Sequence, residues 1–289
     1  MSLKVNGICQ TYPGDIKALQ DVDLELSTGL FGLLGPNGAG KSTLMRILAT
    51  LQLPAKGSIE LDGTNLLKSP KKIRKVIGYL PQEFGVYPRV TARELLSYFA
   101  SLKGISAKER SVEVNEKIEL VDLGRAADRR LGTYSGGMKQ RVGIAAALIG
   151  SPRLLIVDEP TAGLDPLERR KFQLLLSKAA EKSVVIISSH IVDDIADLCD
   201  RLAILYNGRI VSNGCPDKLL SELDGKVWEV FADFHQLDSY HQSHKVLSWQ
   251  PFRGQLKIRL LSDHQPVNLK DASLTKPHLE DLYALHTQA

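Results

Sequence analysis

The stretch GLFGLLGPNGAGKST, residues 29–43, decides the fold of this 289-residue chain. Its first half, residues 29–35, is a short apolar run that predicts a buried strand ending in glycine. Its second half, residues 35–43, has the spacing G-x-x-x-x-G-K-S, in which glycines let backbone N–H groups surround phosphate oxygens. An amphipathic helix follows from apolar residues at helical spacing, Leu44, Ile47, Leu48 and Leu51. Strand, glycine-rich loop and helix in this order predict a phosphate-binding loop (P-loop) in an α/β fold.

The composition is that of an ordinary globular protein, with 43% hydrophobic and 24% charged residues. A net charge of +4 is too small to indicate a nucleic-acid partner, and the basic run at residues 71–75 is typical of a solvated helix face. The three cysteines show no C-x-x-C spacing, which argues against a disulfide framework or a zinc site. No apolar run is long enough to span a membrane, and no signal peptide is visible, so we expect a cytoplasmic protein.

Short apolar runs alternate with helical patterns through about the first 220 residues. Further strands are predicted at residues 58–63, 76–82, 153–160 and 183–190, and the last two have the near-continuous apolar character of strands buried on both faces of a parallel sheet. Residues 91–150 are predicted to be mainly helical, starting at a capping box formed by Thr91 and Glu94. Asp165 and Pro166 predict the N-cap and first turn of another helix.

The composition changes near residue 222. Both tryptophans and six of the seven histidines lie beyond it. Strand patterns at residues 226–234 and 255–261 and a helical pattern at residues 277–289 predict a small, separate α+β unit. His235, His241 and His244 offer no closed metal-ligand set in this unit, so we interpret them as solvated surface.

Polar residues suited to phosphate chemistry lie in the loop and at predicted strand ends. Lys41 would bring positive charge to the β and γ phosphates, and the hydroxyl of Ser42 could bind Mg²⁺. Asp158 could hold Mg²⁺, while Glu159 is placed to orient or deprotonate an attacking water. His190 ends the next strand and could donate a hydrogen bond to the γ-phosphate. Each of these features also has a purely structural alternative. The loop could be a glycine-rich turn without a ligand, Asp158 and Glu159 could cap a turn, and His190 could be a packed polar residue.

Together these residues resemble the nucleotide-binding subunits of ABC (ATP-binding cassette) transporters, over about residues 3–220. Leu154–Glu159 is similar to the Walker B motif of this family. The Walker A motif is matched by Gly35, Pro36, Asn37, Gly38, Ala39, Gly40, Lys41, Ser42 and Thr43. The resemblance implies that Gln82 contacts Mg²⁺ and the attacking water, that His190 is the switch histidine, and that Tyr12 stacks on adenine. It also places the family's D-loop at residues 162–165, with Asp165 among the nucleotide-binding residues.

YSGGM, residues 134–138, is similar to the family's LSGGQ signature and starts a second helix suited to an anion. In the family two copies pack head to tail, and each ATP lies between the P-loop of one copy and the signature of the other. The resemblance therefore implies that Ser135, Gly136 and Gly137 meet the γ-phosphate bound to a second copy. Tyr134 and Met138 replace leucine and glutamine. Met138 cannot donate a hydrogen bond, but the residues that touch phosphate are intact, so nucleotide binding should survive.

The fold implied is a P-loop NTPase of the ABC ATPase type. Residues 1–221 would form the ATPase domain, with a RecA-like core sheet, an N-terminal antiparallel β-subdomain and a helical subdomain at about residues 83–150. Residues 222–289 would form a small C-terminal α+β accessory domain. The implied function is an ATP-binding subunit that hydrolyses Mg-ATP in a head-to-tail dimer and drives transport through a permease on a separate chain. The protein would then lie peripherally on the cytoplasmic face of the cell membrane.

Two segments bear on the expected permease. Phe84, Val86 and Tyr87 follow Gln82 and would form a groove for a short cytoplasmic helix of the membrane subunit, with plain core packing as the alternative. PHLEDLY, residues 277–283, resembles the P-x-L-E-D motif of bacterial exporter ATPases of the drug and sodium export type, which favours export.

Two other functions stay open. A soluble ABC ATPase acting on DNA or ribosomes is disfavoured because Gly35 and Ser135 lie 100 residues apart (135 − 35) with no coiled coil or zinc module between them, and because only one cassette is present. A regulator that binds ATP without hydrolysing it is disfavoured by the intact Glu159 and His190.

Overall fold

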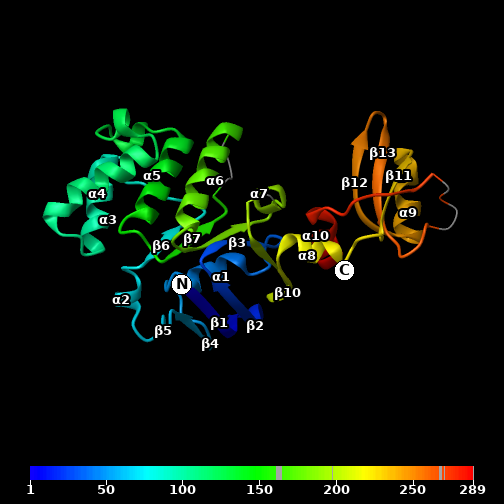
Figure 1. Cartoon of the computed structure of the whole chain (residues 1–289), viewed down its shortest axis with the longest axis horizontal. Coiled ribbons are helices and arrows are strands. Elements are labelled where there is room, and N and C mark those ends of the chain that lie inside the picture. Colours follow the sequence, from blue (N-terminus) through cyan, green and yellow to red (C-terminus); the bar gives the residue numbers. More distant parts are fainter. Residues whose placement is uncertain (161–164, 197, 267–268, 270, 289) are drawn as a thin grey trace.

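The computed structural model describes residues 1–160, 165–196, 198–266, 269 and 271–288. The N-terminal part is an antiparallel sheet with strand order β2-β1-β4-β5 (Figure 1). Its strands are β1 (Ser2–Tyr12), β2 (Ile16–Ser27), β4 (Lys56–Leu61) and β5 (Thr64–Asn65). Alternate residues of β2 are buried, as expected for a strand with one face on the core.

The central sheet has the strand order β10-β9-β3-β8-β7-β6. Its strands are β3 (Gly29–Leu34), β6 (Ile77–Leu80), β7 (Leu154–Asp158), β8 (Val184–Ser189), β9 (Arg201–Tyr206) and β10 (Arg209–Gly214). All neighbours pair in parallel except β10, which is an antiparallel edge. Strands β7 and β8 are buried along their whole length, which confirms their prediction as core strands. Because the strands are parallel, the loops after β3, β6, β7 and β8 leave from one edge of the sheet.

Outside the helical part, the described residues before 222 form the helices α1 (Lys41–Leu48), α2 (Pro70–Ile73), α6 (Pro166–Ala180), α7 (Asp193–Ala196) and α8 (Pro216–Ser221). Helix α1 is shorter than the apolar spacing predicts. Thr50 has a left-handed backbone with φ 57°, and Leu51 beyond it is 60% exposed. The inclusion of Leu51 in the buried face was therefore wrong. The prediction of a solvated basic run is confirmed, because Lys71, Lys72, Arg74 and Lys75 are exposed.

The helical part consists of α3 (Ala92–Leu102), α4 (Ala107–Leu120) and α5 (Gly136–Leu148), with short 3-10 turns at Gly124–Ala126 and Leu131–Thr133. Thr91 and Glu94 form the predicted capping box at the start of α3. Asp165 and Pro166 cap and open α6, as predicted. No helix among the described residues is both long and apolar enough to cross a membrane.

Residues 222–289, called here the C-terminal segment, form the third sheet, with strand order β12-β13-β11-β14 (Figure 1). Its elements are β11 (Val227–Ala232), a 3-10 turn (Phe234–Gln236), α9 (Leu237–Ser243), β12 (Lys245–Phe252), β13 (Gln255–Leu261), β14 (Ser273–Leu274) and α10 (Leu279–Thr287). One apolar cluster lies between this sheet and α9. Helix α10 instead joins the main core, where Leu279 and Leu282 share a cluster with Leu219 and Leu223 of the α8 region. The C-terminal segment is therefore less separate than its composition predicts.

One buried carboxylate fixes α10 in place. Asp281 is fully buried and receives two hydrogen bonds from Arg259 of β13, at 2.8 Å to Oδ1 and 2.7 Å to Oδ2. Its Oδ2 also accepts the backbone N–H of His278 at 2.7 Å, which caps the helix. Paired bonds between a guanidinium and a carboxylate are strong and directional. Asp281 therefore both starts α10 and holds it against β13, and it lies in the PHLEDLY stretch singled out from the sequence.

Candidate active site

The loop between β3 and α1 needs glycine at two positions. A Cβ at Gly35 would lie 2.4 Å from the carbonyl oxygen of Leu205, and one at Gly40 would lie 2.3 Å from that of Ala18. Gly40 also has a left-handed backbone with φ 109°, which L-residues rarely adopt. At these two positions the loop thus lies too close to neighbouring backbone for any larger residue. Its backbone ends at Lys41, the first residue of α1, so the N-terminal N–H groups of this helix border the loop.

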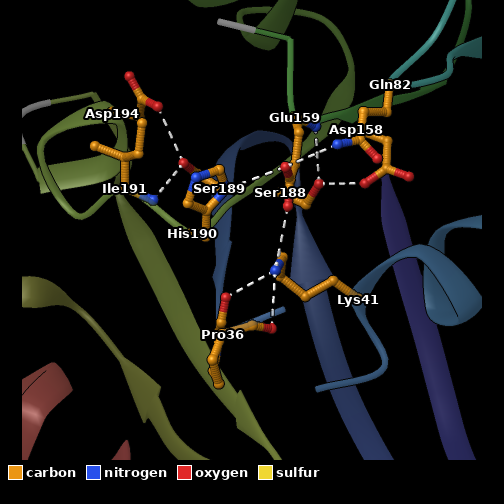
Figure 2. A network of polar contacts seen from close by, with 11 residues as sticks. Pro36, Lys41, Gln82, Asp158, Glu159, Ser188, Ser189, His190, Ile191 and Asp194 are labelled. Atoms are coloured by element: carbon orange, nitrogen blue, oxygen red, sulfur yellow. Dashed lines mark hydrogen bonds and ion pairs between the residues drawn. The ribbon is translucent and has the colours of Figure 1, made fainter. Parts of the chain in front are cut away.

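Lys41 lies beneath this loop and is only 4% exposed. Its Nζ donates to the carbonyl oxygens of Gly35, at 2.7 Å, and Pro36, at 3.2 Å (Figure 2). The same Nζ lies 3.2 Å from Oε1 of Glu159, which is also buried. The lysine charge is therefore held at the centre of the loop, with a carboxylate as its partner.

Glu159 is the point where four segments meet (Figure 2). Besides Lys41, its carboxylate accepts a hydrogen bond from Nε2 of Gln82, at 3.1 Å to Oε2. Nδ1 of His190 lies 3.1 Å from the same oxygen. Glu159 also has a left-handed backbone with φ 44°, a conformation found mainly at functional or strained positions for residues other than glycine. The four residues predicted to be catalytic, Lys41, Gln82, Glu159 and His190, are thus in direct contact.

Ser188 forms hydrogen bonds with both Asp158 and Glu159, and it was not among the residues predicted from the sequence. Its hydroxyl donates to Oδ1 of Asp158 at 2.6 Å and accepts the backbone N–H of Glu159 at 3.1 Å. The pairing of β7 with β8 places Asp158 opposite Ser188. Burial, together with the charge of Asp158, raises the pKa of the Tyr79 phenol on β6. One feature of the sequence could have indicated Ser188: it and Ser189 interrupt an apolar strand just before His190.

The residues predicted to hold magnesium supply one hydroxyl, one amide oxygen and one carboxylate, from Ser42, Gln82 and Asp158. Hard oxygen donors of this kind suit Mg²⁺, which usually retains other ligands such as water and phosphate. No group of three or more His, Cys, Asp or Glu side chains among the described residues is arranged to hold a metal ion by itself. The donor set therefore fits a metal ion that is held jointly with phosphate oxygens.

Tyr12 lies at the end of β1, beside the start of α1. Its hydroxyl is 3.3 Å from Oγ1 of Thr43, the last residue of the loop motif, and donates to Oε1 of Gln52 at 3.0 Å. These contacts bring the half-buried ring next to the P-loop, where the sequence predicts it, and they add a role for the hydroxyl that the sequence did not indicate.

The signature, Tyr134–Met138, opens α5 in the helical part. Ser135 is the N-cap, and its hydroxyl accepts the N–H of Met138 at 3.3 Å. Ser135 and Gly136 are exposed, and no hydrogen bond between described residues joins the signature to the P-loop of the same chain. Figure 1 shows α5 and α1 in different parts of the molecule. The exposed N-terminus of α5 therefore lies apart from the P-loop of its own chain (Figure 1).

The two unusual signature residues face inward. Tyr134 is buried and donates its hydroxyl to the carbonyl of Ala126 at 2.5 Å, and burial raises the pKa of this phenol. Met138 is partly buried and packs against the main core. Both side chains thus make internal contacts, while Ser135 and Gly136 lie at the surface.

Asp165 acts as a helix cap, because its Oδ1 accepts the N–H groups of Leu167, at 3.0 Å, and Glu168, at 2.9 Å. The other predicted D-loop residues, Ala162, Gly163 and Leu164, lie outside the described residues.

The loop after Gln82 divides into buried and exposed residues. Phe84 and Val86 pack against the main core, and the ring of Phe84 lies next to Gly143 of α5. Tyr87 is 69% exposed. Core packing, the alternative to a groove for a partner, therefore accounts for the buried parts of Phe84 and Val86, and Tyr87 is the most exposed of the three side chains.

A cleft of about 900 Å³ opens on the other side of His190. Its walls are the segment from His190 to Ala196, the strands β12 and β13, and α10. It thus lies between His190 and the C-terminal segment. No pattern in the sequence indicates this cleft, because its walls come from segments that are far apart along the chain.

Comparison with known proteins identifies relatives. Residues 19–162 match the family model described as ABC transporter. The chain is 33% identical to the daunorubicin/doxorubicin resistance ATP-binding protein DrrA of Streptomyces peucetius, over 96% of this chain and 86% of DrrA. It is 34% identical to the probable multidrug ABC transporter ATP-binding protein YbhF of Escherichia coli K12, over 78% of this chain. That match spans only 39% of the length of YbhF.

The fold is also found in solved structures. The chain resembles the ATP-binding cassette MJ0796, in a dimeric post-hydrolysis state bound to ADP and Pi, with a TM-score of 0.69 and 28% sequence identity. This likeness covers 74% of the present chain and 98% of that cassette. It confirms the fold class predicted from the sequence.

Proposed function

The chain belongs to the ABC transporter family and carries an ABC ATPase domain, and we propose that it hydrolyses Mg-ATP to drive transport through a separate membrane permease. The observation that carries this proposal is the buried Glu159 carboxylate in contact with Lys41, Gln82 and His190. A carboxylate at the end of a core strand, next to a P-loop lysine, is suited to activating water for attack on a phosphate.

The roles of the site residues follow from their positions. Lys41 presents its charge to the β and γ phosphates, whose oxygens can replace the loop carbonyls as acceptors. Glu159 orients or deprotonates the attacking water, and Gln82 and His190 hold its carboxylate and contact the reacting groups. Ser188 keeps the neighbouring Asp158 in place. Ser42, Gln82 and Asp158 would hold Mg²⁺, which, when bound, neutralises charge on the transferring phosphate.

We further propose that two copies form the complete site, head to tail. The exposed N-terminus of α5, with Ser135, Gly136 and Gly137, would bind the γ-phosphate held by the P-loop of the second copy. The dimeric state of the similar MJ0796 cassette supports this arrangement. In this proposal residues 1–221 are the ATPase domain, and residues 222–289 are an accessory domain whose cleft borders His190.

Tyr12 provides a test of nucleotide binding. Stacking on adenine is worth about 1 kcal/mol, which corresponds to about a fivefold change in Kd. We expect Tyr12→Ala to raise the Kd for a fluorescent ATP analogue by about that factor, and Tyr12→Phe to raise it less than about twofold. Equal loss in both variants would show that the hydroxyl contacts to Thr43 and Gln52 matter and that the ring does not.

The permease would be contacted next to Gln82. Tyr87 is the exposed residue of this loop, whereas Phe84 connects the loop to α5 through Gly143. A partner helix bound at Tyr87 would therefore touch a loop that is linked both to Glu159 and to the signature helix. Export is supported by the PHLEDLY stretch and by relatives named for drug resistance and multidrug transport.

Purification of the full chain from its native membranes tests the proposal. We expect an integral membrane protein to be recovered with it in detergent, and Tyr87→Ala to reduce that recovery without changing the ATPase activity of the isolated chain. Ile16→Ala, which removes a similarly exposed apolar residue on the N-terminal sheet, should leave recovery unchanged. Recovery with ribosomes or DNA, and with no membrane protein, would contradict the proposal.

A further inference from the structure

The first turn of α6 makes ion pairs in two directions. Glu168 accepts a hydrogen bond from Arg141 of α5, at 2.9 Å between Nη2 and Oε1. The next residue, Arg169, pairs with Asp194 of α7. Asp165 caps this same turn through the N–H of Glu168. Two neighbouring side chains of one rigid turn therefore connect α5 to α7.

The pair with α7 continues to the catalytic histidine (Figure 2). Asp194 is 1% exposed, and its Oδ2 accepts a hydrogen bond from the hydroxyl of Ser189 at 3.0 Å. The same hydroxyl accepts the backbone N–H of Ile191 at 2.9 Å. Ser189 and Ile191 are the two neighbours of His190 in the chain. Asp194 thus fixes the backbone on both sides of the residue that contacts Glu159.

The pair with α5 continues to the signature. Arg141 lies in the second turn of α5, and Ser135 is the N-cap of that helix. Arg141 also donates to the carbonyl oxygen of Asp122, just beyond α4, at 3.2 Å. A rotation or shift of α5 would therefore move Arg141 against Glu168.

Both ion pairs are largely shielded from solvent, and this determines how strongly they couple α5, α6 and α7. The Arg141–Glu168 side chains are each about one-fifth exposed, and Asp194 is buried, so the charges are screened less than at the surface. Breaking a buried pair by removing one partner is costly, because the other charge is left without compensation. The elements joined by these pairs are therefore expected to move together.

We propose that the first turn of α6 couples the signature of a chain to the His190 of the same chain, with Glu168, Arg169 and Asp194 as positioning residues. The inference rests on the proposed head-to-tail dimer, in which the signature contacts the ATP of the second copy. ATP in one site then sets the position of His190 in the other. The two sites become coupled, and the coupling is reciprocal for binding.

The test uses the full chain and compares Glu168→Gln with the unaltered protein. We expect ATP hydrolysis by the unaltered protein to be cooperative, with a Hill coefficient clearly above 1 and at most 2, the number of sites. In Glu168→Gln we expect the coefficient to fall to about 1 and kcat to fall about fivefold, the lower end of typical coupling effects. The variant should still bind a fluorescent ATP analogue, now without cooperativity, which a merely unfolded protein could not do.

Exchanging the two charges tests whether the ion pair itself, and not either residue alone, is responsible for the coupling. Arg141→Glu and Glu168→Arg should each lose cooperativity, and the double variant should regain it. Asp128→Asn is the matched control, because it breaks the exposed Arg93–Asp128 pair of the helical part and should change nothing. If Glu168→Gln fails to bind the analogue, Arg141→Gln removes the same ion pair from the other side.

The outcomes distinguish the inference from the function on which it rests. If a Glu159→Gln protein does not dimerise with Mg-ATP, the proposed composite site is wrong, and the inference with it. If that dimer forms but the unaltered protein is not cooperative, only the coupling is wrong. Undiminished cooperativity in folded Glu168→Gln, or in Arg141→Gln where that variant replaces it, also overturns the coupling.

Discussion

Replacing Lys41 with alanine is expected to lower ATP turnover about a thousandfold, the upper range for loss of one group that stabilises transition-state charge. Lys41 is the cation that contacts both the P-loop carbonyls and Glu159. Its removal takes away the charge offered to the phosphates and leaves the buried Glu159 without its ion-pair partner. Binding of ATP should weaken as well, because the same charge attracts the bound phosphates.

Phosphate release measures the Lys41 effect, and the thermal midpoint of unfolding shows whether the variant is folded. The matched control is Lys71→Ala, which removes an exposed lysine from α2 and should leave turnover unchanged. Turnover in Lys41→Ala within a few-fold of the unaltered protein would remove the basis for assigning residues 35–43 to phosphate binding.

The second large effect concerns the dimer. Glu159→Gln keeps the shape of the side chain and removes the base, so turnover should fall at least about a hundredfold. Because hydrolysis no longer ends the bound state, ATP should hold two copies together. Size-exclusion chromatography should show a dimer with Mg-ATP and its dissociation without nucleotide.

Adding Ser135→Arg to Glu159→Gln should abolish the ATP-dependent dimer. The new side chain would occupy the exposed start of α5, while Lys41 and Ser42 of the same chain stay intact and continue to bind a fluorescent ATP analogue. Ser106→Arg is the matched control, because Ser106 is also an exposed N-cap, at the start of α4, but lies outside the signature. A dimer that survives Ser135→Arg, or loss of ATP binding in a folded monomer, would show that the signature does not act across an interface.

Much of the site could be predicted because parallel strands bring their carboxyl ends to one edge. Gln82, Glu159 and His190 each lie at or next to the last residue of a predicted strand, and the structure joins all three. What could not be predicted is pairing between side chains of distant segments. The residues next to Arg169 and Asp194 in the sequence do not indicate that these two side chains pair and link α6 to α7. Ser188 lies in an otherwise apolar run, which predicts a buried strand but not a contact with Asp158.

In the fold, too, features set by local sequence were predicted, and features set by contacts between distant segments were not. The β7 and β8 strands and the α3 and α6 helix starts were predicted, because local capping and apolar runs determine them. The end of α1 was missed, since the left-handed Thr50 stops the helix before the apolar repeat ends. The docking of α10 into the main core was also missed, because it depends on Leu279 and Leu282 meeting Leu219 and Leu223 of a distant segment. For the same reason the sequence did not indicate how α10 is held against β13, through the contact between Asp281 and Arg259.

That contact also sets an order of events during synthesis. Arg259 is made 22 residues before Asp281. Among the described residues, the other carboxylate that accepts a hydrogen bond from its guanidinium is that of Glu229, at 3.4 Å. Domains generally fold from the N-terminus as the chain leaves the ribosome. Residues 1–221 can therefore become compact first, while the side of β13 that carries Arg259 stays hydrated. Once Asp281 has been made, it binds Arg259 and caps α10, so both contacts form together. A nascent chain that stalls before residue 281 would therefore leave this side of the β11–β13 sheet uncovered and able to contact other chains.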